Sequence, residues 1–153
     1  MNRRNPFKIR PVEFSGERAR GSLTLRALDA GSCGDCELEI VALGNPQYDF
    51  ERFGFHLTAS PRHADVLLIS GPFTRSMESA ALAAFEAMPE PRRVVTLGDG
   101  LAEDSPFRAS YAVIPLPDVL RQACVLHIPG DPPAPAELLA GLLSLLHPPA
   151  RKK

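Results

Sequence analysis

Apolar runs alternate with amphipathic stretches along most of the chain, a pattern that predicts strands alternating with helices. Apolar and polar positions alternate over residues 23–30, as in a strand with one buried face, and a second strand is expected at 53–59. Continuous apolar runs at 64–71, 92–100 and 123–130 each end in glycine. Such runs are typical of strands that are buried on both faces of a parallel sheet.

Helical spacing predicts three helices, two between these strands and one after the last of them. A helix is expected over about 37–43, and another over 76–88, with Ser76 as its N-cap and an apolar stripe along one side. The last helix is expected at 134–146, where leucines lie nearly all the way round. Residues 101–122, which include three prolines, are expected to be irregular.

The alternation of strands and helices implies parallel pairing with right-handed crossovers. We therefore predict a single three-layer α/β domain of flavodoxin-like type over residues 23–147, a size that fits one core. Residues 1–22 carry basic groups interleaved with prolines and apolar residues, which is typical of a docking arm that lies along a partner. Residues 148–153 form a basic tail.

Composition narrows the class of function. The formal net charge of −1 does not indicate nucleic-acid binding, and no apolar run approaches the ~18 residues of a membrane span. The first residues lack the apolar core of a secretory signal. Three cysteines, of which two are closely spaced, argue against a disulfide framework and favour a reducing compartment, so a cytoplasmic protein is expected.

Candidate chemistry gathers at one edge of the predicted sheet. Ligands of open parallel sheets bind outside the carboxyl ends of the strands. Loops rich in glycine or proline follow four of the strands, at 31–36, 70–72, 98–100 and 129–133. The first of these contains Cys-x-x-Cys, formed by Cys33 and Cys36, a spacing that suits a metal site, an iron–sulfur cluster or a redox-active thiol pair.

Several longer motifs resemble a known family over roughly residues 23–146. The chain is similar to the small, cluster-bearing subunit of energy-converting [NiFe] hydrogenase and formate hydrogenlyase, which is homologous to the 20 kDa-type subunit of NADH-quinone oxidoreductase, respiratory complex I. The motifs that carry the resemblance, in chain order, are DAGSCGDCELEI, NPQYDFERFG, SPRHADVLLISGPFTRSM, MPEPRRVVTLGDG and HIPGDPPAPAELLAGLLSLL.

The resemblance implies one [4Fe–4S] cluster held by four thiolates from three loops. Cys33 and Cys36 match the first two ligands, whereas Gly100 and Asp131 stand at the other two positions. Gly100 has no side chain to offer, and the oxygen of Asp131 is a harder, weaker ligand for iron than sulfur. Cys124 lies about 20 Å along a strand from the Asp131 turn and is expected to fill the core instead.

Three interpretations of the thiols remain open, and we favour them in the order given. The site is vestigial; or Cys33, Cys36 and Asp131 form an altered metal or iron–sulfur site; or the two thiols are a redox pair. The resemblance associates Glu39 with proton movement; without the resemblance, a solvated or salt-bridged carboxylate would be the better interpretation. No other catalytic residue is expected.

The preferred function is a peripheral, electron-transfer-type subunit of a hydrogenase-like or complex I-like oxidoreductase complex, rather than an enzyme by itself. With a degenerate cluster site, its main role would be structural docking on the large subunit. The alternatives are an electron-transfer subunit with an unusually ligated cluster and a free-standing Cys-x-x-Cys redox or metal-binding protein. The partners would hold the chain at the inner face of the cytoplasmic membrane, with no span of its own.

Overall fold

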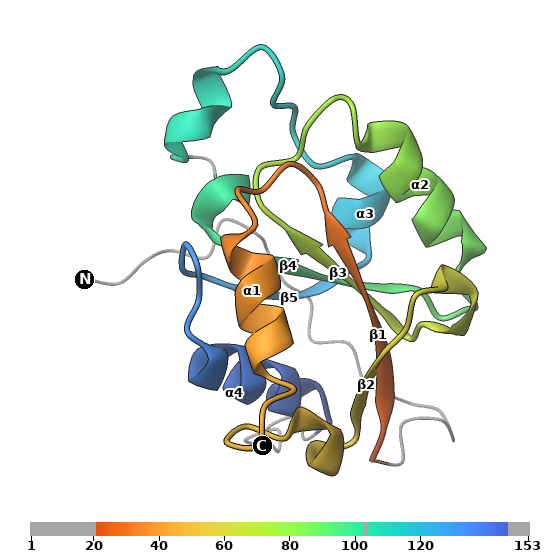
Figure 1. Cartoon of the computed structure of the whole chain (residues 1–153). Helices are drawn as coiled ribbons and strands as arrows, with labels where there is room; N and C mark the ends of the chain where they lie inside the picture. The colour runs from red at the N-terminus through yellow and green to blue at the C-terminus, as the bar shows by residue number, and fades with distance from the viewer. Residues whose placement is uncertain (1–20, 103, 147–153) are drawn as a thin grey trace, which may run out of the picture.

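The structure is a computed structural model that describes residues 21–102 and 104–146. Five parallel strands form one sheet in the order β2-β1-β3-β4-β5 (Figure 1). The strands are β1 (Leu23–Asp29), β2 (Phe55–Leu57), β3 (Val66–Ser70), β4 (Arg93–Leu97) and β5 (Cys124–Ile128). The α-helices are α1 (Asp35–Ala42), α2 (Glu78–Ala87), α3 (Asp118–Gln122) and α4 (Pro135–Leu146). Short 3₁₀ turns lie at Phe50–Phe53, Pro61–His63, Asp99–Leu101 and Pro106–Ala109.

The central strand β3 explains why the chain forms a parallel sheet. Every residue of Val66–Ser70 is buried, because helices cover both faces of the strand. Its two neighbours pair with it in parallel over the whole of β3, with Leu25 of β1 opposite Val66 and Arg93 of β4 opposite the same residue. The apolar run therefore has a partner strand on each side, to which its backbone groups can hydrogen-bond.

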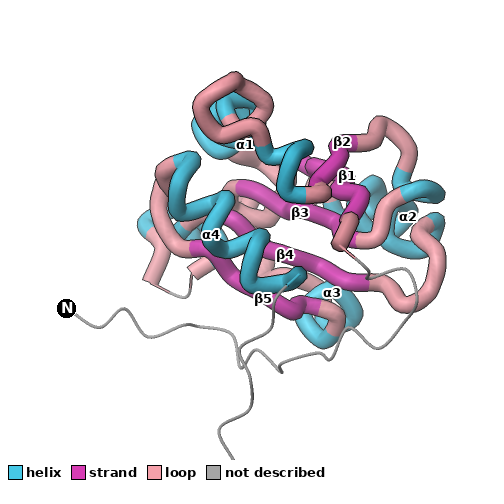
Figure 2. The backbone as a smooth tube through the Cα atoms, turned by 90° about the horizontal axis from the view of Figure 1, so that it is seen from below, coloured by secondary structure: helices cyan, strands magenta, loops and turns pink. Residues whose placement is uncertain are grey.

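The helices form two layers, one on each side of the sheet (Figure 2). Helices α1 and α4 cover one face, where their apolar residues join β1, β3, β4 and β5 in a single core cluster. Helices α2 and α3 cover the other face, where Phe85 and Leu120 belong to a second cluster. Strand order 2-1-3-4-5 with helices on both faces is the flavodoxin-like arrangement. The predicted fold class is confirmed.

Two local predictions were wrong, and a predicted strand is shorter than expected. Residues 101–122 are not irregular throughout, because α3 forms there after Pro117 and buries Leu120 completely. The strand expected at 53–59 is only three residues long. Ser76 does not cap α2: the N-cap is Met77 without a side-chain hydrogen bond, and the Ser76 hydroxyl lies 3.3 Å from the hydroxyl of Thr74 instead.

The arm predicted at 1–22 and the tail at 148–153 lie almost wholly outside the described residues, so both stay predictions. Among the residues that the structure describes, no helix has both the length and the apolar character needed to cross a membrane.

Candidate functional site

The loops at the carboxyl edge of the sheet are bound to one another in pairs. The loop after β1 is joined to the loop after β3, where Thr74 donates to the carbonyl of Ala30 from its amide (2.9 Å) and from its hydroxyl (2.6 Å). The loop after β4 is joined to the loop after β5, where the Gly130 amide donates to Asp99 Oδ1 (2.9 Å) and the Asp99 amide donates to the Gly130 carbonyl (3.2 Å). The predicted gathering of loops at this edge is therefore present.

Asp29, the last residue of β1, shapes the turn that carries the first cysteine. Its Oδ1 accepts hydrogen bonds from the amides of Gly31 (2.7 Å) and Ser32 (2.6 Å). An aspartate that accepts from the backbone two and three residues ahead is a common way to close a turn. Cys33 follows this turn, is exposed, and donates from its thiol to Asp35 Oδ2 at 3.1 Å.

Glu37 connects α1 with the ends of two strands. Its carboxylate accepts a hydrogen bond from the Ser32 hydroxyl (2.5 Å) and another from the hydroxyl of Ser70, the last residue of β3. Ser70 is only 2% exposed, so its bond to the carboxylate lies largely away from water, where a lost partner is costly. The two bonds, which we call the Glu37 clamp, hold the first turn of α1 against the sheet edge.

Cys36 points inward from α1 and is 1% exposed. Burial, followed by the negative charges of Glu37 and Asp131, raises the pKa of its thiol to about 12. Smaller contributions from Cys33 and Asp35 act in the same direction. At neutral pH the Cys36 side chain is therefore a protonated thiol, whereas the form of cysteine that binds iron and other metals is the thiolate.

Cys36 and Asp131 meet at Gly98, at the carboxyl end of β4. A Cβ atom built on Gly98 would lie 3.3 Å from Cys36 Sγ and 3.8 Å from Asp131 Oδ1. Gly98 also has a φ of 87°, a backbone conformation that side chains disfavour. The structure thus brings together two of the three residues predicted for an altered site, Cys36 and Asp131, around a residue without a side chain.

Gly100 faces backbone rather than an open site. A Cβ atom built on it would lie 2.7 Å from the nitrogen and 2.8 Å from Cδ of Pro72, and 2.9 Å from the carbonyl carbon of Gly71. These are chain and ring atoms, which cannot rotate away as the end of a long side chain does. The loop after β3 therefore fills the space that a side chain at position 100 would need.

The donor set of the described residues does not fit a four-iron cluster. A cubane requires one ligand per iron, normally a thiolate. This edge supplies the exposed thiol of Cys33, the buried thiol of Cys36 and the carboxylate of Asp131, while Gly100 supplies nothing. Across residues 21–102 and 104–146, no group of three or more His, Cys, Asp or Glu side chains is arranged to hold a metal ion.

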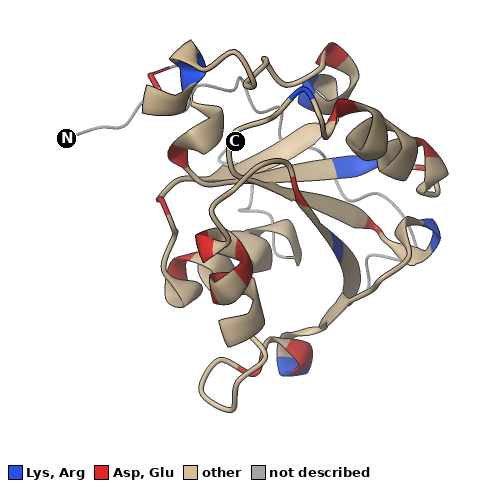
Figure 3. Cartoon of the chain, turned by 45° about the horizontal axis from the view of Figure 1, so that its top comes forward, with Lys and Arg blue, Asp and Glu red and all other residues tan. Residues whose placement is uncertain are grey.

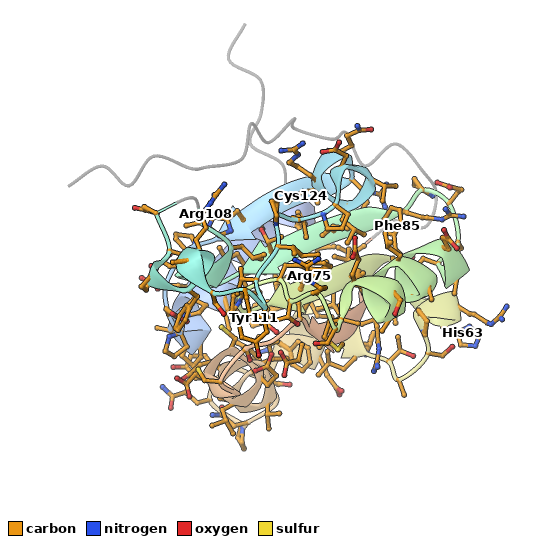
Figure 4. The ribbon with its side chains drawn as sticks, turned by 90° about the horizontal axis from the view of Figure 1, so that it is seen from above. His63, Arg75, Phe85, Arg108, Tyr111 and Cys124 are labelled. Atoms are coloured by element: carbon orange, nitrogen blue, oxygen red, sulfur yellow. The ribbon has the colours of Figure 1, made fainter. Side chains whose placement is uncertain are left out.

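Cys124 lies apart from this site, whereas Glu39 lies beside it on α1. Cys124 is buried in the core beneath α2 and α3, where its thiol donates to the Leu126 carbonyl (3.4 Å), as expected of a core cysteine (Figure 4). Glu39 is half-buried one turn after Cys36 on α1, and nothing in the structure tests a proton-transfer role for it. The ring of His127 is buried and its Nδ1 lies 3.0 Å from the Thr96 hydroxyl.

A small cavity lies beside Gly100, and neither Cys33 nor Cys36 is among its lining residues. Its volume is about 140 Å³, and its lining includes Phe73, Gly100 and Arg108. Sites for drug-sized organic ligands typically measure roughly 300–1,000 Å³. This cavity is therefore too small for such a ligand.

Two features of the edge were not predicted from the sequence, namely the Glu37 clamp and the contact of Gly100 with the Gly71–Pro72 backbone. Glu37 follows Cys36 directly in the motif and carries no signal that would separate it from the neighbouring acids. The sequence does give a signal for the contact at Gly100. Gly-Pro follows one strand and Gly-x-Gly follows the next, and glycine allows two backbones to approach closely.

Comparison with known proteins shows which family the chain matches. Residues 33–145 match the family described as NADH ubiquinone oxidoreductase, 20 Kd subunit. An NADH-quinone oxidoreductase subunit from Carboxydothermus hydrogenoformans is 40% identical over 111 residues, which cover 72% of this chain and 66% of that protein. Formate hydrogenlyase subunit 7 of Escherichia coli is 38% identical over 130 residues, which cover 85% of this chain and 51% of that protein. The chain thus spans about half to two thirds of the length of these relatives.

Solved structures share the fold. A chain of the membrane-bound sulfane sulfur reductase, an archaeal respiratory membrane complex, superposes with a TM-score of 0.68 at 24% identity, covering 84% of this chain and 71% of that one. A chain of an NAD⁺-reducing [NiFe]-hydrogenase superposes with a TM-score of 0.53 at 13% identity, covering 82% and 91%. The resemblance noted in the sequence is thereby confirmed: the chain belongs to the NADH ubiquinone oxidoreductase, 20 Kd subunit, family.

Proposed function

We propose that the chain is a peripheral subunit of a complex I-like or hydrogenase-like membrane complex, in which it docks on the large subunit without carrying a four-iron cluster. Family membership supports the first half of this proposal, because relatives are named as subunits of NADH-quinone oxidoreductase and of formate hydrogenlyase. A probable membrane-bound hydrogenase subunit of Pyrococcus furiosus, 37% identical over 78% of this chain and 71% of that protein, adds to that support.

The packing of Gly100 carries the second half. The resemblance places the third thiolate at this position, yet the Gly71–Pro72 backbone occupies the space beside it. With Asp131 at the fourth position, two of the four iron positions would lack a sulfur ligand. Loss of the ligands together with closure of the loops is what a subunit retained for docking would show.

The thiols of Cys33 and Cys36 favour neither a redox-active pair nor an altered metal site. A thiolate at Cys36 is disfavoured, because burial and neighbouring acids raise the pKa of that thiol to about 12. A mononuclear site would need a third ligand beside Cys33 and Cys36. Asp131 is close to Cys36, but its negative charge adds to the cost of forming the thiolate there.

Iron analysis of the full chain tests the cluster-free state. The chain is produced without oxygen in cells that assemble iron–sulfur clusters, and iron, acid-labile sulfide and the EPR spectrum after reduction are measured. We expect well under one iron per chain and no cluster signal, whereas a relative with four cysteines, prepared in parallel, should hold about four irons. A reducible centre with about four irons in this chain would refute the cluster-free proposal.

Isolation from membranes tests the docking role. An affinity tag on the chain should retain a large hydrogenase-like or complex I-like subunit in a stoichiometric complex. A chain that is recovered as a solitary monomer from mildly solubilised membranes would contradict the proposed function, whatever its iron content.

A further inference from the structure

The two edges of the sheet differ in how they are protected against further pairing. Strand β2 forms one edge with only three residues, of which two are exposed. Strand β5 forms the other edge with five residues, of which four are buried, and Figure 2 shows it as the outermost strand on the side opposite β2. Sheet edges usually carry charged residues or proline, which discourage pairing. The β5 sequence, Cys-Val-Leu-His-Ile, contains no proline, lysine, arginine or acid, so it resembles an inner strand.

Most of β5 is regular enough to pair with a further strand. One register shift lies at its start, where Val94 and Val95 of β4 pair with Cys124 and Leu126. From Leu126 to Ile128 the pairing with β4 continues without another shift. Within residues 21–102 and 104–146, no strand lies on the outer side of β5. An extended segment on that side can therefore add to the sheet through backbone hydrogen bonds.

A segment of matching pattern lies in the first residues of the chain, outside the described part. Residues 7–10 read Phe-Lys-Ile-Arg, in which apolar and basic side chains alternate as in a strand with one covered face. Pro11 follows, and proline in sheets is confined mainly to edge strands and to positions where pairing stops. This pattern suits an edge strand rather than an inner one.

The connection to β1 is long enough to bring this segment to β5. In the sheet order, a strand outside β5 is four spacings from β1, or about 19 Å. Residues 11–20 can span up to about 33 Å when extended. The chain enters β1 at the amino edge of the sheet, so the direct path along that edge makes the added strand antiparallel to β5. An antiparallel edge strand on an otherwise parallel sheet is common in doubly wound folds.

Charge also favours contact between the first residues and the rest of the chain. Residues 1–20 contain six basic and two acidic residues, whereas residues 21–146 contain eight basic and sixteen acidic residues. Figure 3 shows the acidic positions spread over the helices and loops of the described part. Two of these acids, Asp131 and Glu137, follow β5 in the next loop and in the first turn of α4. Segments of opposite net charge attract each other, which raises the population of the contact.

We infer that residues 7–10 form a sixth strand, antiparallel to β5 and paired with its outer edge. The arm that the sequence suggests would lie along a partner is thus placed on its own chain. The sheet then ends in a strand that carries two basic residues and is followed by proline, the features that protect an edge from further pairing. The inference goes beyond the proposed function and does not depend on it.

Hydrogen exchange of the full chain, followed by mass spectrometry, tests the pairing. The test variant is Lys8→Pro with Ile9→Pro. Successive amides of a strand point to opposite sides, so one of the two prolines removes a donor of the new ladder. Relative to peptides that cover β3, we expect the outward-facing amides of residues 124–128 to exchange about tenfold faster in this variant than in the wild-type chain.

Ser15→Pro with Gly16→Pro is the matched control. It introduces the same two rings into the connection rather than into the proposed strand, and exchange in β5 should stay within about twofold of the wild-type rate. Equal exchange in the wild-type chain and the Lys8→Pro, Ile9→Pro variant would overturn the inference.

Crosslinking distinguishes the arm of the same chain from a second copy. A water-soluble carbodiimide condenses a carboxylate with a lysine amine to an amide and is itself hydrated to a urea. Lys8 is the one lysine before residue 152, so its bonds report where the arm lies. In a mixture of chains with natural and heavy nitrogen, we expect Lys8 to be joined to Asp131 or Glu137 of the same isotope. Bonds only between isotopes, bonds only to Glu51 beside β2, or no bonds from Lys8 would overturn the inference.

Discussion

The contact between Gly100 and the Gly71–Pro72 backbone should make position 100 intolerant of any side chain. Gly100→Ala adds one carbon atom, and its ideal position lies 2.7–2.9 Å from three atoms of that backbone and ring. Carbon atoms normally come no closer than about 3.5 Å, so at least one loop must move by several tenths of an ångström. Both loops are held by hydrogen bonds to their neighbours, which restricts that movement.

The cost can be estimated from overpacked cores, where an inserted methyl group typically lowers the free energy of unfolding by about 1–3 kcal/mol. For a domain of this size, 1 kcal/mol corresponds to a shift in Tm of about 2–4 °C. We therefore expect Gly100→Ala to lower Tm by about 4–8 °C, taking 2 kcal/mol as the central value. Thermal unfolding followed by circular dichroism, together with urea denaturation at 25 °C, measures the change.

Gly44→Ala is the matched control. It introduces the same methyl group, but its nearest neighbour would be the Val41 carbonyl oxygen at 3.4 Å, an ordinary contact. This variant should be neutral or slightly stabilising, by up to about 1 kcal/mol, because alanine restricts the unfolded chain. If Gly100→Ala is as stable as Gly44→Ala, the loop after β3 does not fill the third ligand position, and the main support for a closed site is lost.

Three further predictions concern the thiols and the clamp. At pH 8, iodoacetamide should label the exposed Cys33 rapidly, and Cys36 and Cys124 only after denaturation; fast labelling of all three would contradict the burial described. Because folding raises the pKa of Cys36 from 9.0 to about 12, its stabilising contribution is complete below pH 9 and is lost as the pH rises toward 12. Urea denaturation across that range should show the fall in unfolding free energy, and Cys36→Ala should flatten it. Glu37→Ala removes the acceptor of two hydroxyl groups and should cost about 2 kcal/mol, whereas Glu39→Ala should cost under about 0.5 kcal/mol by the same assay; equal costs would argue against the clamp.

The sheet could be predicted from the sequence because burial on both faces imposes a continuous apolar run. Val66–Ser70 is the clearest case, and the glycines after such runs mark where the loops gather. Helix α3 was missed because five residues between a proline and a strand are too short for a periodic pattern to stand out. Its position is decided by the burial of Leu120, which is a tertiary effect.

The sequence was enough to predict which residues gather at the candidate site, but not which of them touch one another. The loops that carry Cys33, Cys36, Gly98, Gly100 and Asp131 follow from strand order alone. Which of these residues touch depends on how closely the backbones approach, and that is set by contacts between atoms far apart in the sequence. The serines that hold Glu37 lie on either side of it along the chain, 5 and 33 residues away, so spacing within one motif could not reveal the clamp.

The direct backbone contact at Gly100 also bears on how such a chain can change over generations. A cysteine introduced there would meet the Gly71–Pro72 turn and weaken the fold at once. Any benefit from metal binding would require a second substitution at Asp131 and a shift of that turn in the same lineage. A single substitution of Gly100 by cysteine would therefore cost stability without completing a set of four sulfur ligands, so the contact opposes the stepwise building of such a set in this chain.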